Sequence, residues 1–336
     1  MSQLEFAIEL GTTNTVIYKR GSGIVLCEPS LIALSKENKK TVVKAVGTLA
    51  KKMLGKTSSA TTISNPIEEG VIKDKELAYS MLKHFMKKII TEKFVKPKIR
   101  MLFVIPCGLN IREKAEYKSL GYRLGAGKVD FVESVIAALV GAGVSTENPS
   151  GVMSLNLGGG TVNVGAVSLN TIINGYTISI GGAKMDEAIK RYVEEAYELE
   201  ISNQTAEKIK KEIGSLYIHD TSNMEVNGID TATKAPKQEV VFSTNIRPAI
   251  EYYFQKISAA VEDILNNCSP DIVADIANNG VYVTGGLANL TGIENYLKKR
   301  LRLPIYVVDE PEEAVIIGAG KLLSDKRGLN SIIREN

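Results

Sequence analysis

An apolar run, a glycine-rich turn and a second apolar run follow one another twice along the chain. The first occurrence is Phe6–Tyr18, with its turn at Gly11-Thr12-Thr13-Asn14, and the second is Met153–Ser168, with its turn at Gly158-Gly159-Gly160-Thr161. Short apolar runs bounded by small residues are typical of β-strands. The repeat therefore predicts two similar lobes, each with a tight turn between two strands, that face one shared cleft.

The rest of the chain alternates between helical and strand-like spacing of apolar residues. Helices are expected at residues 74–90, 111–124, 134–143, 185–197, 205–213, 247–266 and 292–300, and further strands at 24–27, 100–105, 129–132, 176–180, 240–243 and 281–283. Two polar stretches without clear periodicity, residues 36–44 and 220–237, are interpreted as loops or as edges of small subdomains.

These elements predict a mixed α/β protein with two lobes. The first lobe is expected to span residues 1–145, with a small subdomain at about 34–75. The second is expected to span residues 146–314, with a small subdomain at about 186–239, and residues 315–336 are expected to form a C-terminal helix that returns to the first lobe.

The composition narrows the class of protein. Lys and Arg number 41 against 38 Asp and Glu, a net charge of +3 that argues against a dedicated nucleic-acid binder. The three cysteines, Cys27, Cys107 and Cys268, lie far apart and form no CxxC pair, so neither a zinc site nor a disulfide framework is indicated. No signal peptide and no apolar stretch of the ~20 residues needed to span a bilayer is found. We therefore expect a cytoplasmic protein.

The two glycine-rich turns have a chemical use. Glycine lets the backbone approach an anion closely, and successive N–H groups can then point at phosphate oxygens. One such turn could equally be a simple β-hairpin. Two at equivalent places, with a third glycine pair at Gly285-Gly286 after the expected strand 281–283, favour a phosphate site.

The turns are part of a longer set of motifs that resembles the MreB family of bacterial actin-like filament proteins. The matching segments run in order from about residue 6 to about residue 322; they are Glu9–Thr15, Gly23–Ser30, Gly70–Ile72, Glu147–Gly151, Leu157–Thr161, Met185–Ile189, Thr205–Glu207, Glu212–Gly214 and Thr284–Gly286. Actin, Hsp70 chaperones and sugar kinases share the phosphate turns. Glu28-Pro29-Ser30 and Met185–Ile189 are the segments that favour MreB among them.

This resemblance implies the actin/Hsp70-type ATPase superfold, with two duplicated lobes around a nucleotide cleft. It implies ATP or ADP with Mg²⁺ as cofactors, and self-association into protofilaments at the inner face of the membrane. Partners would be other copies of the chain, paralogous filament proteins and a membrane surface, but no nucleic acid. The lysine-rich, tryptophan-free composition fits one of several paralogues of a wall-less bacterium such as a spiroplasma.

The resemblance also assigns roles to single residues. It implies nucleotide binding by Gly11, Thr12, Thr13 and Asn14, by Gly158, Gly159, Gly160 and Thr161, by Glu207 and Lys210 at the ribose and adenine, and by Gly285, Gly286 and Leu287 against the adenosine. Glu207 and Lys210 are three residues apart on an expected helix, so both can face one ligand. A surface ion pair is the alternative interpretation of these two residues.

The chain departs from the family pattern where the chemistry would occur. Glu9 and Asn156 stand where the family has Asp, and both are expected near Mg²⁺ through water. Ser134 stands where the family has the glutamate that activates water, while Thr161, which resembles the other residue placed near the attacking water, is retained. Glu133 is adjacent and could substitute, although its side chain leaves the backbone in another direction. We expect these changes to slow ATP hydrolysis, which depends on an oriented nucleophile and on electrostatics.

A membrane contact and other functions remain open at this point. Phe94 and Val95 lie between lysines and would form an apolar loop able to touch anionic lipid; alternatively Phe94 packs on its own lobe. A sugar or metabolite kinase of the same superfold would need an acidic base facing a substrate, for which no candidate is found. An Hsp70 chaperone would need a substrate-binding domain after the ATPase. A nucleotide-sensing scaffold that never hydrolyses ATP is a variant of the leading hypothesis.

Overall fold

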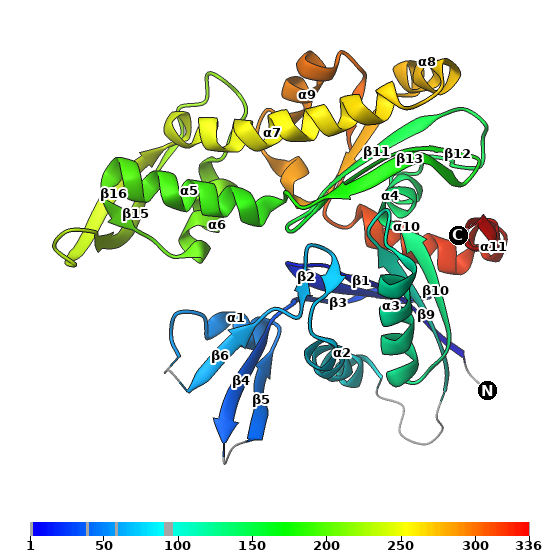
Figure 1. The fold of residues 1–336 in the computed structure, drawn as a ribbon, viewed down its shortest axis with the longest axis horizontal. Helices are drawn as coiled ribbons and strands as arrows, with labels where there is room; N and C mark the ends of the chain where they lie inside the picture. Colours follow the sequence, from blue (N-terminus) through cyan, green and yellow to red (C-terminus); the bar gives the residue numbers. More distant parts are fainter. Residues whose placement is uncertain (1–2, 38–39, 58–59, 91–96, 336) are drawn as a thin grey trace.

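Two five-stranded sheets with the same strand order form the two lobes (Figure 1). The computed structural model describes residues 3–37, 40–57, 60–90 and 97–335. The strands are β1 (Gln3–Leu10), β2 (Asn14–Lys19), β3 (Gly23–Pro29), β9 (Lys98–Ile105) and β10 (Ala126–Glu133) in the first lobe, and β11 (Val152–Leu157), β12 (Val162–Ser168), β13 (Thr171–Ile178), β17 (Val281–Thr284) and β18 (Ile305–Val307) in the second.

The strand pairing of one sheet repeats in the other. The orders are β10-β9-β1-β2-β3 and β18-β17-β11-β12-β13. In each sheet the central strand, β1 or β11, pairs antiparallel with the next strand and parallel with a strand from much later in the lobe. The repeat seen in the sequence is thus a repeat of topology, and the predicted two-lobed α/β fold is confirmed.

Helices pack on the sheets and lie between them. They are α2 (Lys75–Ile89), α3 (Ile111–Arg123), α4 (Ser134–Gly141), α5 (Gly182–Tyr197), α6 (Asn203–Ile213), α7 (Ser243–Asn266), α8 (Pro270–Asn279), α9 (Ile293–Leu301), α10 (Ala314–Ser324) and α11 (Lys326–Glu335), with a short 3₁₀ helix at Gly286–Asn289. The sequence did not predict α8, although Ser269 caps its N-terminus and Pro270 follows at a favourable position. Helix α7 begins at Ser243, before the expected position near Arg247.

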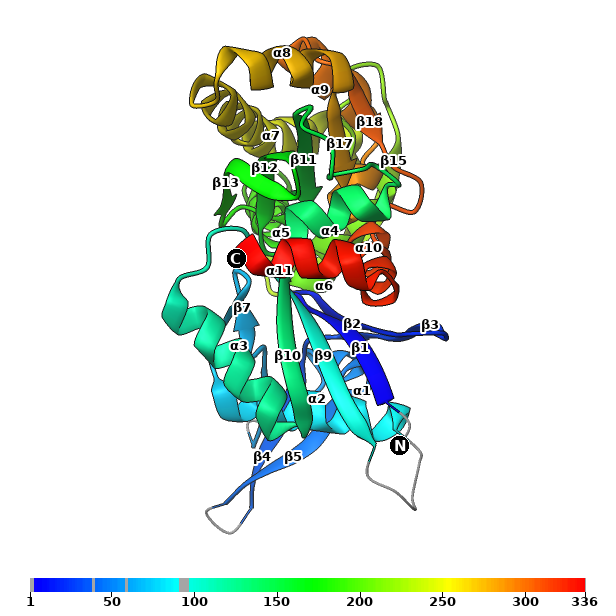
Figure 2. The same ribbon diagram turned by 90° about the vertical axis from the view of Figure 1, so that its right-hand side faces the viewer.

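Helices α4 and α10 cross between the two sheets (Figure 2). Helix α4 packs on β11 and β12 of the second lobe, and α10 packs on β1 and β2 of the first. A Cβ atom at Gly141 would lie 1.8 Å from the carbonyl oxygen of Ala314, and one at Gly318 would lie 1.8 Å from that of Ala137. The two backbones therefore touch, and only glycine fits at the crossing.

Small sheets extend both lobes. The first lobe adds β4 (Ile32–Glu37), β5 (Lys40–Val46), β6 (Thr61–Ser64), the short pair β7 (Ile67–Glu68) and β8 (Val71–Ile72), and helix α1 (Thr48–Lys52); the second adds β14 (Leu199–Glu200), β15 (Asn223–Asp230) and β16 (Pro236–Phe242). Of the two interpretations of residues 36–44 and 220–237, the one as loops was wrong, because the described parts of both contain paired strands; these strands belong to the small sheets, in agreement with the alternative of small subdomain edges. Most residues of β5, including Val42 and Val43, are exposed, so no buried face imposes an alternating pattern.

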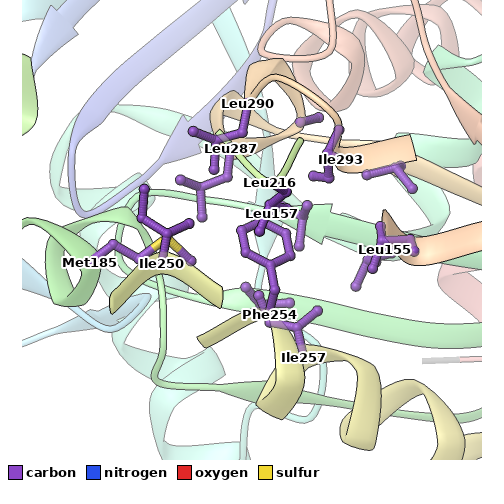
Figure 3. Packing of buried hydrophobic residues seen from close by; sticks show 14 of the residues in the cluster. Leu155, Leu157, Met185, Leu216, Ile250, Phe254, Ile257, Leu287, Leu290 and Ile293 are labelled. Carbon is purple, nitrogen blue, oxygen red and sulfur yellow. The ribbon is translucent and has the colours of Figure 1, made fainter. Parts of the chain in front are cut away.

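A continuous apolar core supports the second turn. Leu155 and Leu157 of β11 point into this core beside Phe254 of α7 and Leu287 (Figure 3). Because Gly158 directly follows Leu157, the turn begins immediately after a fully buried residue. The core thus fixes the place at which the second turn emerges from its sheet.

Candidate nucleotide site

The two glycine-rich turns have the same internal hydrogen bond. In the first, the N–H of Gly11 donates to the carbonyl of Asn14 at 3.1 Å; in the second, the N–H of Gly158 donates to that of Thr161 at 2.9 Å. A Cβ atom at Gly11 or at Gly158 would lie 2.8 Å from the same accepting oxygen. The duplication of the two lobes therefore includes the hydrogen bond that closes each turn.

The turns also touch one another across the lobes. A Cβ atom at Gly159 would lie 1.9 Å from Oγ1 of Thr13, and one at Gly160 would lie 2.3 Å from Oγ1 of Thr12. The structure thus brings together the residues that the sequence assigned to phosphate binding, with two threonine hydroxyls opposite a glycine backbone. Such a pair of turns can present N–H groups and hydroxyls to an anion from two sides.

Residues outside the turns hold them in place. The side chain of Asn65 donates to the carbonyl of Thr12 at 2.6 Å, and the hydroxyl of Ser30 donates to that of Gly11 at 2.6 Å. The N–H groups of Gly182 and Ala183, at the start of α5, donate to the carbonyls of the second turn. Sequence analysis gave none of these residues a role, although Ser30 lies within a segment that carried the family resemblance.

Steric crowding explains why position 181 is a glycine. A Cβ atom there would lie 2.6 Å from the carbonyl oxygen of Gly159. The start of α5 therefore lies directly against the second turn.

Glu207 and Lys210 lie on α6 but have different partners. Lys210 is buried; its Nζ lies 2.7 Å from Oδ1 of Asp186 and donates to the carbonyl of Gly182 at 2.8 Å. Glu207 is half-buried and pairs with Lys211 at 2.8 Å and, across the lobes, with Lys51 at 3.4 Å.

The charge state of Glu207 follows from these partners. Burial raises its pKa, but hydrogen bonds and charge from Lys211 and Lys51 outweigh burial, so the pKa lies below its ordinary value. Glu207 also lines a groove of about 460 Å³ between α1 and α6. It therefore presents an ionised carboxylate at an opening between the lobes, where a sugar hydroxyl could donate to it.

The glycine pair after β17 closes the other side of the second turn. Gly285 has φ +87°, and a Cβ atom there would lie 2.4 Å from the carbonyl oxygen of Leu157. Leu287 is buried, and its Cδ2 lies 3.4 Å from the position that a Cβ atom at Gly182 would take. The structure thus groups Gly285, Gly286 and Leu287 with Gly182 and Lys210.

The two candidates for water activation differ in their surroundings. Ser134 is the first residue of α4, and its buried hydroxyl has no hydrogen-bond partner among the residues that the structure describes. Glu133 is also buried, and its Oε1 lies 3.8 Å from Nζ of Lys114 on α3. Burial raises the pKa of Glu133, against the effect of Lys114 and of the Gly108 N–H. Glu133 is thus engaged by α3, while the buried hydroxyl of Ser134 is not held by any partner among the described residues.

The candidate magnesium ligands suit a cation held through water. Glu9 is half-buried, and Asn156 is buried with its Oδ1 accepting from the hydroxyl of Thr284 at 3.3 Å. Within the described ranges, no group of three or more Asp, Glu, His or Cys side chains could hold a metal directly. One carboxylate and one amide fit a Mg²⁺ ion that keeps most of its waters and takes further oxygens from phosphate.

Glu9 allows a prediction on stability. Burial raises its pKa from 4.5 to about 7, so its proton stabilises the fold below pH 4.5, and this contribution is lost as the pH rises through 7. Glu9→Gln cannot ionise, so its unfolding free energy relative to the wild type should increase with pH. We expect this difference between variant and wild type to be about 1–3 kcal/mol larger at pH 8 than at pH 5. Urea unfolding without nucleotide measures this, with the exposed Glu68→Gln as control. A gain that does not change with pH would contradict it.

The proposed membrane loop, Phe94 and Val95, lies outside the described residues. Among the helices that the structure describes, none combines the length and the apolar character needed to cross a bilayer.

Comparison with known proteins finds relatives along nearly the whole chain. The model of a family described as MreB/Mbl protein matches residues 3–331. The cell shape-determining protein MreB of Pasteurella multocida is 36% identical over 324 residues, which cover 95% of this chain and 92% of that protein. The cell shape-determining protein Mbl of Bacillus subtilis is 34% identical over 324 residues, covering 96% of both.

Solved structures give the same result. A crystal structure of MreB5 of Spiroplasma citri bound to ADP matches with a TM-score of 0.91 and 31% identity, over 98% of both chains. The MamK double helical filament has the same fold, with a TM-score of 0.80 over 96% of this chain and 99% of that one, at 19% identity. The family model and the curated relatives together show that this chain belongs to the MreB/Mbl family.

Proposed function

We propose that the chain binds ATP and ADP between its lobes, with the phosphates on the turns at residues 11–14 and 158–161. The observation that carries this proposal is the pair of identically bonded turns in direct contact across the lobes. MreB5 of Spiroplasma citri, which shares the fold at about 30% identity, has been crystallised with ADP and with AMPPNP. Glu207 and Lys210 would meet the ribose and adenine, and Gly285, Gly286 and Leu287 would meet the adenosine.

We further propose that the chain hydrolyses ATP slowly. A bound Mg²⁺ would neutralise charge on the phosphates, with Glu9 and Asn156 holding its waters. The hydroxyl of Ser134 can hydrogen-bond the attacking water but is a poor base, and Glu133 is paired with Lys114. Thr161, the last residue of the second turn, remains as the other polar group at the phosphates, so a small residual rate is expected. Complete loss of turnover would make the chain a nucleotide-sensing scaffold.

We propose that the subunit polymerises into actin-like filaments that act in cell shape or motility. Membership of a family of cell shape-determining proteins supports this, and so does the fold shared with the MamK filament. Further copies of the chain are the main partners, with paralogous filament proteins and the inner face of the membrane as additional ones. We place the protein in the cytoplasm.

We expect filaments to form with ATP and without rapid hydrolysis. The family likeness covers nearly the whole chain, whereas the departures from the family pattern lie at the proposed nucleotide site. Sedimentation and phosphate release should be measured side by side with ATP, with ADP and without nucleotide. We expect pelleted filaments in electron micrographs before appreciable phosphate appears. Monomers alone, far above micromolar concentration and with every nucleotide, would refute polymerisation.

A further inference from the structure

Asn163 connects the second turn to the first lobe. It lies on β12, is 4% exposed, and its side chain contacts three separate elements. Oδ1 accepts from the N–H of Cys107, in the segment after β9, at 3.2 Å, and lies 2.6 Å from the hydroxyl of Thr177 on β13. Nδ2 lies 3.4 Å from Oγ1 of Thr161. The function proposed above uses Thr161 but leaves Asn163 without a role.

The chemistry of its partners fixes the orientation of the Asn163 amide. The N–H of Cys107 can only donate, so the atom that faces it must be the carbonyl oxygen. The single hydroxyl hydrogen of Thr177 is shared between Oδ1 and the carbonyl of Cys107, which lies 2.8 Å away. The opposite orientation would set two donors against each other at a buried position. Nδ2 therefore faces Thr161.

The direction of this bond decides what Thr161 can do. An amide nitrogen has no acceptor, so Oγ1 of Thr161 must accept from Asn163. The hydroxyl hydrogen is then left for another acceptor, and no further hydrogen bond of this hydroxyl is found in the described part of the chain. Thr161 is only half-buried. Its hydroxyl can thus donate to a bound ligand.

The position of Thr161 in the turn indicates which phosphate it would meet. Gly158 and Gly159 are bonded to the start of α5, beside Leu287 and Lys210 on the proposed adenosine side. Thr161 is at the other end of the turn. A Cβ atom at Gly70 of the first lobe would lie 3.7 Å from Cγ2 of Thr161. A nucleotide laid along the turn from the adenosine end would reach Thr161 with its terminal phosphate.

We infer that Asn163 is a positioning residue that makes the Thr161 hydroxyl a hydrogen-bond donor to the γ-phosphate, and so favours ATP over ADP. This inference rests on the nucleotide binding proposed above. A donor to a phosphate oxygen holds the substrate. It does not accept a proton from the attacking water, so Thr161 would bind ATP and would not act as a base.

The isosteric variant Asn163→Asp tests this polarity. Its carboxylate can still accept from Cys107 and Thr177, but Thr161 would then donate to the carboxylate instead of the phosphate. We expect calorimetric titration with Mg²⁺ to show AMPPNP affinity lowered about tenfold, the usual effect of losing a hydrogen bond to a charged group, with little change for ADP. Thr161→Val should lower the AMPPNP affinity in the same way.

Two further variants separate positioning from a structural role. Asn163→Ala removes the amide but leaves the Thr161 hydroxyl free to turn toward phosphate, so its loss of AMPPNP affinity should be smaller than that of Asn163→Asp. Thr177→Val alters the same network away from Thr161 and should leave the ratio of AMPPNP to ADP affinity unchanged. Equal losses for both nucleotides, or a larger loss for Asn163→Ala, would overturn the inference. Failure of the wild type to bind either nucleotide would refute the proposed function itself.

Discussion

Ser134→Glu combined with Asn156→Asp is expected to raise the rate of phosphate release by at least about tenfold, because a positioned acid–base group usually contributes 10²–10⁴-fold. The hydroxyl of Ser134 is buried at the start of α4 and, among the described residues, has no partner. Asp at position 156 can still accept from Thr284 and restores a negative charge near the proposed Mg²⁺. Phosphate release under saturating Mg-ATP measures the gain.

Controls separate this explanation from general divergence of the site. Ser134→Ala should change the rate little, because the serine is a poor base. Thermal unfolding should show that the double variant remains folded, since a glutamate at a 4% exposed position carries a cost of burial. A wild-type rate equal to that of ordinary family members would contradict the argument from lost carboxylates. Glu133 would then be the residue to test, although Lys114 holds it in this structure.

Gly159→Val is expected to lower the affinity for both ATP and ADP about five- to 150-fold, if the 1–3 kcal/mol typical of overpacking falls on the binding-competent arrangement of the turns. A Cβ atom at this position would lie 1.9 Å from Oγ1 and 2.9 Å from Cβ of Thr13, so the two turns would be pushed apart. The displaced backbone could not approach the phosphates from both sides. Calorimetric titration with each nucleotide measures the loss.

Gly127→Val is the matched control. A Cβ atom there would meet only the carbonyl oxygen of Ile99, at an ordinary 3.8 Å, and the position belongs to strand β10, away from the turns. Its nucleotide affinity should equal that of the wild type. If Gly159→Val also binds normally, the second turn does not hold the phosphates.

The fold could be predicted where local pattern and burial agree. The turn at Gly158–Thr161 was visible because fully buried strands on either side read as apolar runs. Helix α3 begins at Ile111, as expected, because a capping box at Asn110 starts it there, and it ends one residue before its expected limit. Of the hairpin of β15 and β16, only residues 240–243 at the end of β16 were predicted. Strand β15 was missed because most of its residues are polar, so the alternating burial along the strand is not matched by an alternation of clearly apolar side chains.

Site residues were harder to predict where they depend on contacts distant in sequence. The glycines of the turns could be identified from the sequence, since only glycine permits the close approach seen at Gly160. Nothing near Lys51 indicates that it pairs with Glu207, or near Asn65 that it holds Thr12. Asn163 lies within an apolar strand, and its sequence neighbours do not indicate a role for this single polar residue. Its role follows only from partners that the fold brings from two lobes.

The crossing of α4 and α10 has a mechanical consequence. Since the backbones at Gly141 and Gly318 meet without a side chain between them, α4 and α10 lie very close together, and their contact is the most extensive between any two elements that the structure describes. Helix α4 also packs on the second sheet and α10 on the first, so this contact joins the two lobes. A side chain at either glycine would push the helices apart and, with them, the two sheets. The spacing of the lobes, and with it the width of any cleft between them, therefore depends on two residues without side chains.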